Sequence, residues 1–163
     1  MIKFIGDGGH AKVLQEINNL TWEQQLSNQL QDDLPYVEKW IIAVGDNEDR
    51  KKEAEAHKMR DFVTLIHPSA IIGSDVEIGK GTVIMAGVVV QPGCRIGKHV
   101  ILNTSCSIDH DTIIEDFAHI APGCNLCGGC FVGEGALMGV GSCAVPDAYI
   151  NAWSIIKAGR VIE

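Results

Sequence analysis

The chain has 163 residues, 46% of them apolar and 21% charged, so it can bury a hydrophobic core and is not expected to be disordered. Its formal net charge of −8 argues against a binding surface for nucleic acids or for anionic membranes. The first residues do not form a basic segment followed by an apolar stretch, and no apolar run has the length of a membrane span. We therefore expect a cytoplasmic protein with no nucleic-acid or membrane partner.

Residues 1–62 alternate predicted strands with predicted helices. The strands are expected at Ile2–Ile5 and Trp40–Val44, and the helices over about Ala11–Leu20 and Glu48–Met59. A strand, a glycine turn and a helix in succession are typical of a doubly wound α/β fold. The segment is too short for a complete dinucleotide domain, so we predict a truncated Rossmann-like subdomain that holds the phosphates or the base of a nucleotide.

The first glycine turn fits the dinucleotide fingerprint loosely. Gly6, Gly8 and Ala11 have the spacing G-x-G-x-x-A, and the pair Asp32-Asp33 could supply the acidic residues farther on. The alternative is that these glycines serve only the backbone geometry of the turn. Both interpretations stay open on the sequence alone.

From Ile66 onward an apolar residue recurs at every sixth position without a break. The series is Ile66, Ile72, Ile78, Ile84, Val90, Ile96, Leu102, Ile108, Ile114, Ile120, Leu126, Val132, Met138, Ala144, Ile150, Ile156 and Ile162. The residue four places after each is mostly small or β-branched. A period of six indicates one short strand and one turn per repeat, with three strands closing a triangular coil. Residues 18 apart then stack at about 4.8 Å, and we predict a parallel β-helix over residues 63–163.

The six cysteines include a C-x2-C-x2-C run, formed by Cys124, Cys127 and Cys130. This spacing invites an iron–sulfur or zinc assignment. Four cysteines (Cys94, Cys106, Cys124 and Cys130) occupy the small position of the repeat, where cysteine acts as a small hydrophobic residue. Three cysteines around one coil point in different directions and cannot converge on one ion, so we predict no metal site.

Polar residues that the repeat does not require are the candidates for chemistry. Asn103 opens a segment in which His110 is flanked by two carboxylates, one of them Asp111, and His119 follows nine residues later. Acyl transfer from a thioester needs a base for the incoming nucleophile and a donor for the developing oxyanion. Histidine titrates in the range that a base requires. His99 is expected to be only a solvated turn residue.

Three segments of the chain resemble one known family. They read GDGGHAKV from Gly6, IAVGDNEDRKK from Ile42 and LNTSCSIDHDTIIEDFAHIAPG from Leu102. They are similar to the hexapeptide-repeat acyltransferases that include sialic acid O-acetyltransferases and UDP-4-amino-sugar N-acetyltransferases. The resemblance implies a left-handed β-helix, an exception to the usual crossover hand. It also implies a homotrimer, acetyl-CoA as donor and a sugar or nucleotide sugar as acceptor, with direct attack in a ternary complex.

The resemblance also implies roles for individual residues. His110 matches the general base, and Asp111 stands where the family usually has the glutamate that raises the basicity of that histidine. His119 matches a histidine that contacts acetyl-CoA across the trimer interface. The other positions that match contacts to acetyl-CoA are Asn103, Gly128, Val140 and Ala158, with the N–H of Gly128 directed to the thioester oxygen. The positions that match the acceptor site are Gly8, Gly9, His10, Asp32, Asp33 and Gly45.

The chain departs from the family pattern in two places. The stretch between Asp33 and Trp40 is too short for the usual extra strand, and the sequence ends at Glu163 without the family's C-terminal tail. We therefore expect an altered acceptor pocket and a reduced wall around the adenine end of CoA.

Two other functions remain open at this stage. A zinc hydratase resembling the γ-class carbonic anhydrases would use His99, His110 and His119 as ligands between subunits. A non-catalytic binding module would keep the scaffold and lose the chemistry. The sequence leaves the identity of the sugar open, and the choice between a nitrogen and an oxygen acceptor.

Overall fold

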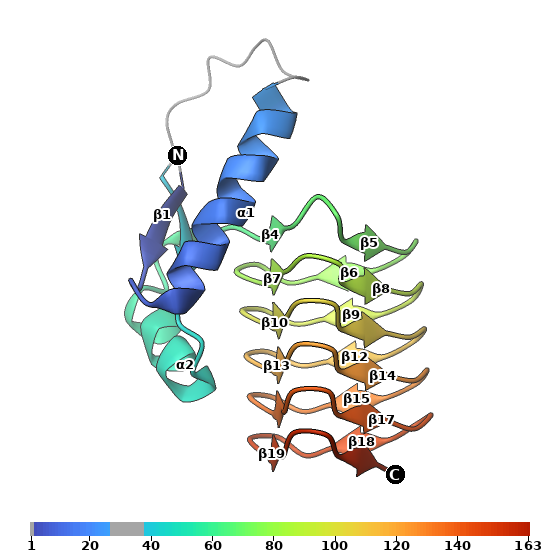
Figure 1. Ribbon diagram of the computed structural model, residues 1–163. Helices are drawn as coiled ribbons and strands as arrows, with labels where there is room; N and C mark the ends of the chain where they lie inside the picture. Colours follow the sequence, from blue (N-terminus) through green and yellow to red (C-terminus); the bar gives the residue numbers. More distant parts are fainter. Residues whose placement is uncertain (1, 27–37) are drawn as a thin grey trace.

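The computed structural model describes residues 2–26 and 38–163, with side chains for residues 2–20 and 38–163. A small α/β part lies against one side of a long coil of short strands (Figure 1). None of the helices among these residues is long and apolar enough to cross a membrane.

The α/β part contains β1 (Ile2–Ile5), α1 (Gly9–Leu26), β2 (Lys39–Ile42), α2 (Asn47–Ala56) and β3 (Asp61–Phe62). The three strands form one parallel sheet in the order β1-β2-β3. The predicted pairs of strands and helices are confirmed, although α1 continues beyond the predicted end. The third strand was not predicted, because two residues carry no periodic signal of their own.

The start of α2 is fixed by a local cap. Asp46 is in extended conformation, and its Oδ1 accepts a hydrogen bond from the N–H of Asp49 at 3.0 Å. Glu48 and Asp49 place negative charge in the first turn, which the helix dipole favours. The cap therefore sets the path of the chain from Gly45 into α2.

From Leu65 onward the chain forms a left-handed parallel β-helix, as predicted. Its two-residue strands are β4 (Leu65–Ile66), β5 (Ile71–Ile72), β6 (Glu77–Ile78), β7 (Val83–Ile84), β8 (Val89–Val90), β9 (Arg95–Ile96), β10 (Ile101–Leu102), β11 (Ser107–Ile108), β12 (Ile113–Ile114), β13 (His119–Ile120), β14 (Asn125–Leu126), β15 (Phe131–Val132), β16 (Leu137–Met138), β17 (Cys143–Ala144), β18 (Tyr149–Ile150), β19 (Ile155–Ile156) and β20 (Val161–Ile162).

Every third strand belongs to the same sheet. The three sheets run β4 to β19, β5 to β20 and β6 to β18, and each strand pairs with the strand one coil away, 18 residues along the chain. Ile101 pairs with His119, for example, and Ser107 with Asn125. The division of the chain into two domains at residues 62 and 63 stays a prediction.

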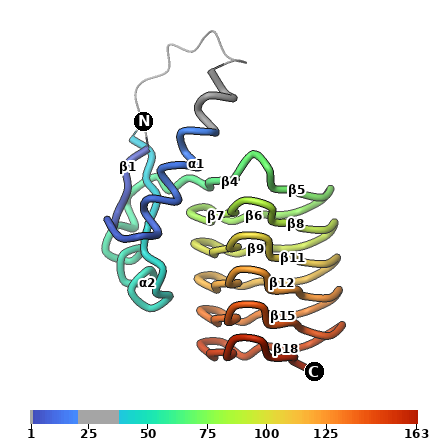
Figure 2. Tube along the Cα trace, in the orientation of Figure 1, coloured from blue at the N-terminus to red at the C-terminus, as the bar shows by residue number. Residues whose placement is uncertain are grey.

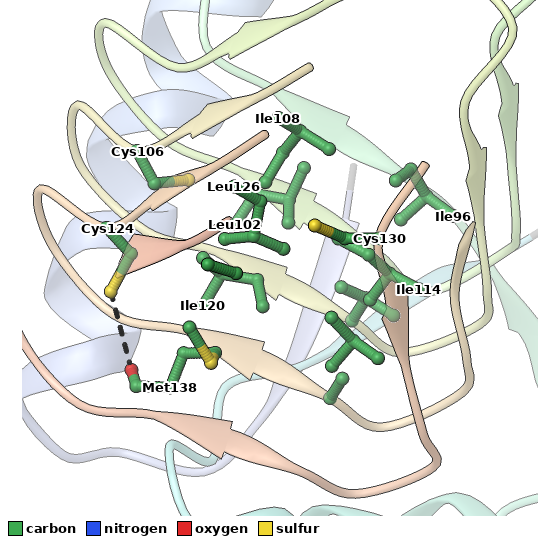
Figure 3. Packing of buried hydrophobic residues seen from close by; sticks show 14 of the residues in the cluster. Ile96, Leu102, Cys106, Ile108, Ile114, Ile120, Cys124, Leu126, Cys130 and Met138 are labelled. Atoms are coloured by element: carbon green, nitrogen blue, oxygen red, sulfur yellow. Dashed lines mark hydrogen bonds between the residues drawn. The ribbon is translucent and has the colours of Figure 1, made fainter. Parts of the chain in front are cut away.

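The interior of the coil is filled by the two residue series that the sequence defines. Ile108 and Ile120 are fully buried, and so are Cys106 and Cys124 at the small positions. Figure 3 shows these side chains pointing into the prism. Cys94 and Cys130 are buried as well, whereas Cys127 is half-buried in a turn, and all six cysteines are free thiols.

The α/β part covers the upper coils on one face. Leu14 and Ile17 of α1 and Ile41 of β2 pack with Val83 and Ile101, on the outer side of the sheet that starts with β4. Figure 2 shows α1 and α2 beside the edge of the coil formed by β4, β7 and the strands below. The register of this sheet places His119 next in the same outward row, after Val83 and Ile101.

Candidate functional site

His110 and Asp111 form a hydrogen-bonded pair in the turn between β11 and β12. The Nδ1 atom of His110 lies 2.9 Å from Oδ2 of Asp111, and 63% of the histidine side chain is exposed. The hydrogen bond to Asp111 and, next, the charge of Asp109 raise the pKa of His110. With Nδ1 bonded to the carboxylate, Nε2 is the ring nitrogen that can accept a proton from a bound molecule.

Gly128 lies directly against the ring of His110. A Cβ atom at Gly128 would sit 2.6 Å from Nε2 of His110 and 2.7 Å from Cε1. The ring can therefore rest in this position only because residue 128 has no side chain. The backbone of residue 128 and the reactive nitrogen thus border the same space.

His119 has a different environment from His110. It is the first residue of β13, and its Nε2 lies 3.1 Å from Nδ2 of Asn103, which donates to it. Burial, and then the charges of Arg50 and His10, lower the pKa of His119 to about 4, while a hydrogen bond to the backbone of Gly45 opposes this shift. His119 is therefore a neutral ring held between two neighbours.

The glycine turn of the α/β part brings His10 into the same region. Burial and the charge of Arg50 lower the pKa of His10 to about 4, and its Nε2 is buried with no hydrogen-bond partner among the described residues. The charge of His10 in turn acts on His119. Gly8 and Gly9 have open space where a side chain would be, so the turn leaves room beside His10.

A small hollow lies where the start of α2 meets the coil. It encloses about 120 Å³ and includes His119, Gly45 and Asn47, together with the apolar side chains Leu137 and Trp153. The side chain of Asn47 spans it, because Nδ2 donates to the carbonyl oxygens of Gly135 and Ala136 at 3.0 and 3.3 Å. The hollow therefore lies between Gly45, which is predicted to bind the sugar acceptor, and His119, which is predicted to contact acetyl-CoA.

Arg50 is a residue of this region that the sequence analysis missed. It is 1% exposed and bonds the backbone on both sides of the junction between α2 and the coil. The available signal was an arginine in the fourth position of α2, after Gly45-Asp46-Asn47, but a charged residue in a charged helix gives no sign of burial.

The prediction for His99 is wrong. The side chain is only 6% exposed, and its ring stacks on Phe117 at 5.3 Å and meets the edge of Phe62 at 4.8 Å. Burial is the main cause that lowers the pKa of His99 to about 4. A turn of the coil is normally solvated, but here β3 and α2 cover it, so the histidine became part of the junction.

A larger hollow lies elsewhere. It encloses about 660 Å³ beside His99 and Phe117, at the ends of α2 and β3. Of the candidate residues it includes only His99, which the sequence offered solely as a ligand of the alternative zinc hydratase. Its size alone does not make it the candidate site, because neither His110 nor His119 lines it.

The remaining predicted residues are placed as follows. Val140 is exposed, and its carbonyl oxygen accepts a hydrogen bond from Gly159, next to Ala158, on the following coil. Both positions belong to the row of turns that also contains Asn103. Asp32 and Asp33 lie outside the described residues.

The structure thus forms two groups of predicted residues. One consists of His110, Asp111 and Gly128, and the other joins His119 to Asn103, His10 and Gly45. Among the residues with described side chains, no hydrogen bond or ion pair links the two groups, and no cluster of three His, Cys, Asp or Glu side chains could hold a metal ion.

Comparison with known proteins adds a family match and relatives. Residues 75–110 match the bacterial transferase hexapeptide family (six repeats). UDP-N-acetylbacillosamine N-acetyltransferase of Bacillus subtilis is 39% identical over 52% of this chain and 51% of that protein. The carnitine operon protein CaiE of Escherichia coli is 34% identical over 61% of this chain and 54% of that protein. The matched region therefore spans about half the length of these relatives.

Solved structures extend the similarity to nearly the whole chain. PerB from Caulobacter crescentus, in complex with CoA and GDP-perosamine, has a TM-score of 0.88 and 30% identity, covering 99% of this chain and 88% of that one. The acetyltransferase domain of PglB from Neisseria gonorrhoeae has a TM-score of 0.88 and 29% identity, covering 99% and 90%.

Proposed function

We propose that this chain, a member of the hexapeptide-repeat family, transfers an acetyl group from acetyl-CoA to an amino group of a nucleotide-linked sugar. The observation that carries the proposal is the exposed His110–Asp111 pair beside Gly128. A nitrogen acceptor is favoured because relatives of this chain are named as N-acetyltransferases.

The chemistry follows from the atoms of that pair. Nε2 of His110 takes a proton from the acceptor amine as its nitrogen attacks the thioester carbonyl, while Asp111 fixes the tautomer through Nδ1. The backbone N–H of Gly128 donates to the oxygen that becomes negative in the tetrahedral intermediate. The intermediate then expels the CoA sulfur, and the proton held by His110 returns to the thiolate. No covalent acyl-enzyme is required.

The remaining predicted residues bind rather than react. The turn at Gly8, Gly9 and His10 and the loop at Gly45 hold the nucleotide sugar, and Asp32 and Asp33 belong to the same proposed site. Asn103, His119, Val140 and Ala158 line the path of acetyl-CoA. Acetyl-CoA is a co-substrate in this reaction, and no metal takes part in it.

We further propose that the active form is a homotrimer with one site at each contact between copies. His110 lies in one row of turns, whereas His119 begins a strand of a different sheet, after the next row of turns. A donor lying between two copies could meet the His110 group of one and the His119 group of the other.

The zinc hydratase gains no support from the placement of the histidines. His99 is packed between two aromatic rings, and the Nε2 atom of His119 accepts a hydrogen bond from Asn103. Nδ1 of His99 has no hydrogen-bond partner among the described residues but is buried, so neither ring presents the accessible, convergent nitrogen that a zinc ligand needs. The non-catalytic module is distinguished from the enzyme by turnover alone.

The direct test measures thiol release from acetyl-CoA with four acceptors. These are a UDP-linked 4-amino sugar, GDP-perosamine, and the matching 4-hydroxy sugars as oxygen acceptors. We expect turnover with an amino sugar, and a loss of about 10²–10⁴-fold in kcat/KM in His110→Ala. His57→Ala, which changes a half-buried histidine just after α2, is the control and should keep full activity. Binding of acetyl-CoA without turnover on any acceptor would favour the non-catalytic module.

A further inference from the structure

Arg50 is the most completely buried charged residue of the described chain. Its guanidinium makes seven hydrogen bonds, six of them to backbone carbonyl oxygens. No carboxylate is hydrogen-bonded to it among the described residues, and burial lowers its pKa to about 10. Burying a cation with no hydrogen-bonded anion costs free energy of folding. We therefore expect Arg50 to have a role that an apolar side chain could not perform.

The bonds of Arg50 divide between two parts of the molecule. Nη1 donates to the carbonyl oxygens of Val44, Gly45 and Asp46 at 3.2, 3.0 and 3.3 Å. These three residues form the loop that precedes α2. Every donor of this nitrogen is thus directed at the loop that carries the proposed acceptor contact.

The other two nitrogens reach the β-helix. Nε donates to the carbonyl oxygen of His99 at 2.8 Å, and Nη2 donates to that of Phe117 at 2.6 Å. Phe117 lies two residues before His119, in the turn that leads into β13. One rigid planar group therefore bonds the loop at Gly45 and the turn that positions His119.

We propose that Arg50 is a positioning residue for acetyl transfer, which holds the Gly45 loop and His119 in one fixed relation across the junction. The inference rests on the proposed function, since it assigns Gly45 to the acceptor and His119 to the donor. Gly45 is hydrogen-bonded to both Arg50 and His119. Its carbonyl oxygen accepts a hydrogen bond from Arg50, and its backbone is hydrogen-bonded to His119. A shift of this loop would move the acceptor relative to the thioester without removing any reacting group.

The groups around His119 make this relation measurable. Asn103 bonds its ring from the coil, His10 and Arg50 act on it from α1 and α2, and Asp46 and Glu48 line the same hollow. Among the described residues, the charge of Arg50 lowers the pKa of His119, so removal of that charge should let the pKa rise from its value of about 4. The histidine thus reports on Arg50 independently of turnover.

Two variants separate the charge of Arg50 from its geometry. Arg50→Met removes both, whereas Arg50→Lys keeps a positive charge but offers donors from a single nitrogen that cannot reach all the carbonyls. Lys51→Met is the matched control, because Lys51 also bridges the junction through Glu134 at 2.8 Å but does not bond the Gly45 loop. Each protein is assayed well below its own melting temperature.

The first readout is the titration of His119, followed by NMR on protein with labelled histidine. We expect an upward shift of the pKa of His119 in Arg50→Met, and no shift in Lys51→Met. An unchanged titration in a folded Arg50→Met variant, or an equal shift in the control, would overturn the proposal.

The second readout is the division between kcat and KM, with acetyl-CoA and the amino sugar nucleotide that the wild type acetylates. We expect Arg50→Lys to lose about 10²-fold in kcat, as misplacement of a reacting group by about 1 Å can cause, with a smaller change in the KM for acetyl-CoA. Wild-type kcat in Arg50→Lys would refute positioning. If the wild type acetylates neither sugar nucleotide, the proposed function fails, whereas the titration still shows whether Arg50 acts on His119.

Discussion

Two histidines nine residues apart have opposite electrostatic environments in this protein. His110 is exposed and bonded to a carboxylate, which raises its pKa, whereas His119 is half-buried, and desolvation, followed by the charge of Arg50, lowers its pKa to about 4. The sequence pattern named both as candidates but could not separate them by burial. In the proposed mechanism His110 is the proton acceptor and His119 a neutral binding group, and the two environments are consistent with these roles.

The raised pKa of His110 predicts the pH dependence of the reaction. The neutral ring is the active base, so kcat/KM should increase with pH through a value above 6.5, the ordinary pKa of histidine. Asp111→Asn removes the first cause of the shift and should move this limb to lower pH while lowering the plateau. A pH–rate profile of both proteins measures this, and a limb that stays in place in Asp111→Asn would contradict the account.

Gly128 gives a second test at the residue scale. In Gly128→Ala the new methyl would overlap Nε2 of His110, and the exposed ring must turn away. We expect a loss of kcat of at least about tenfold with little change in stability, because surface changes usually alter it by about 0.5 kcal/mol or less. In a His110→Ala background the same substitution should cost no further activity. A cost that is equal in both backgrounds would show that residue 128 acts independently of His110.

The elements of the β-helix are decided by a local rule, and the sequence predicts them well for that reason. Each six-residue repeat has the same two inward positions, one for a large residue such as Ile108 and one for a small residue such as Cys124. A period of six therefore places both residues in the core without knowledge of any distant residue. The junction with the α/β part obeys no such rule. The carbonyl partners of Arg50 at His99 and Phe117 lie 49 and 67 residues away along the chain, and no local pattern connects them.

The same distinction explains the errors. His99 occupies a turn that the repeat leaves exposed, and only the covering by β3 and α2 makes it part of a core. The strand β3 was missed because its two residues gain their strand character from pairing with Lys39 and Trp40. The His110–Asp111 contact was foreseeable because adjacent residues in one turn need no distant partner.

The small inward position predicts a size limit for the core. Cys124 is fully buried, and its Sγ donates to the carbonyl oxygen of Gly139 at 3.1 Å. Cys124→Leu should lower the free energy of unfolding by about 1–3 kcal/mol through overpacking. Cys143→Leu, at an outward position of β17, is the control and should change it far less. Chemical denaturation of both variants decides, and a larger loss in Cys143→Leu would refute the inward assignment.

At the scale of the whole molecule, the two groups of site residues lie on different parts of one coil. In a single chain, His110 lies in a turn between β11 and β12. His119 begins β13, in the sheet on which the α/β part packs. The account therefore requires a second copy to complete the site. The oligomer should sediment as three chains of 17.6 kDa each, and a monomer that retains full activity would exclude a shared site.

The most direct measurement of the central claim mixes two inactive variants. His110→Ala and His119→Ala are purified separately, and each is expected to show strongly reduced acetyl transfer as a homotrimer. After unfolding and refolding together in equal amounts, about a quarter of the contacts should pair an intact His110 with an intact His119, if the copies associate at random around a threefold axis. The account predicts that activity returns to about this fraction of wild type. If mixed trimers form and show no more activity than the separate variants, then the site does not lie between copies.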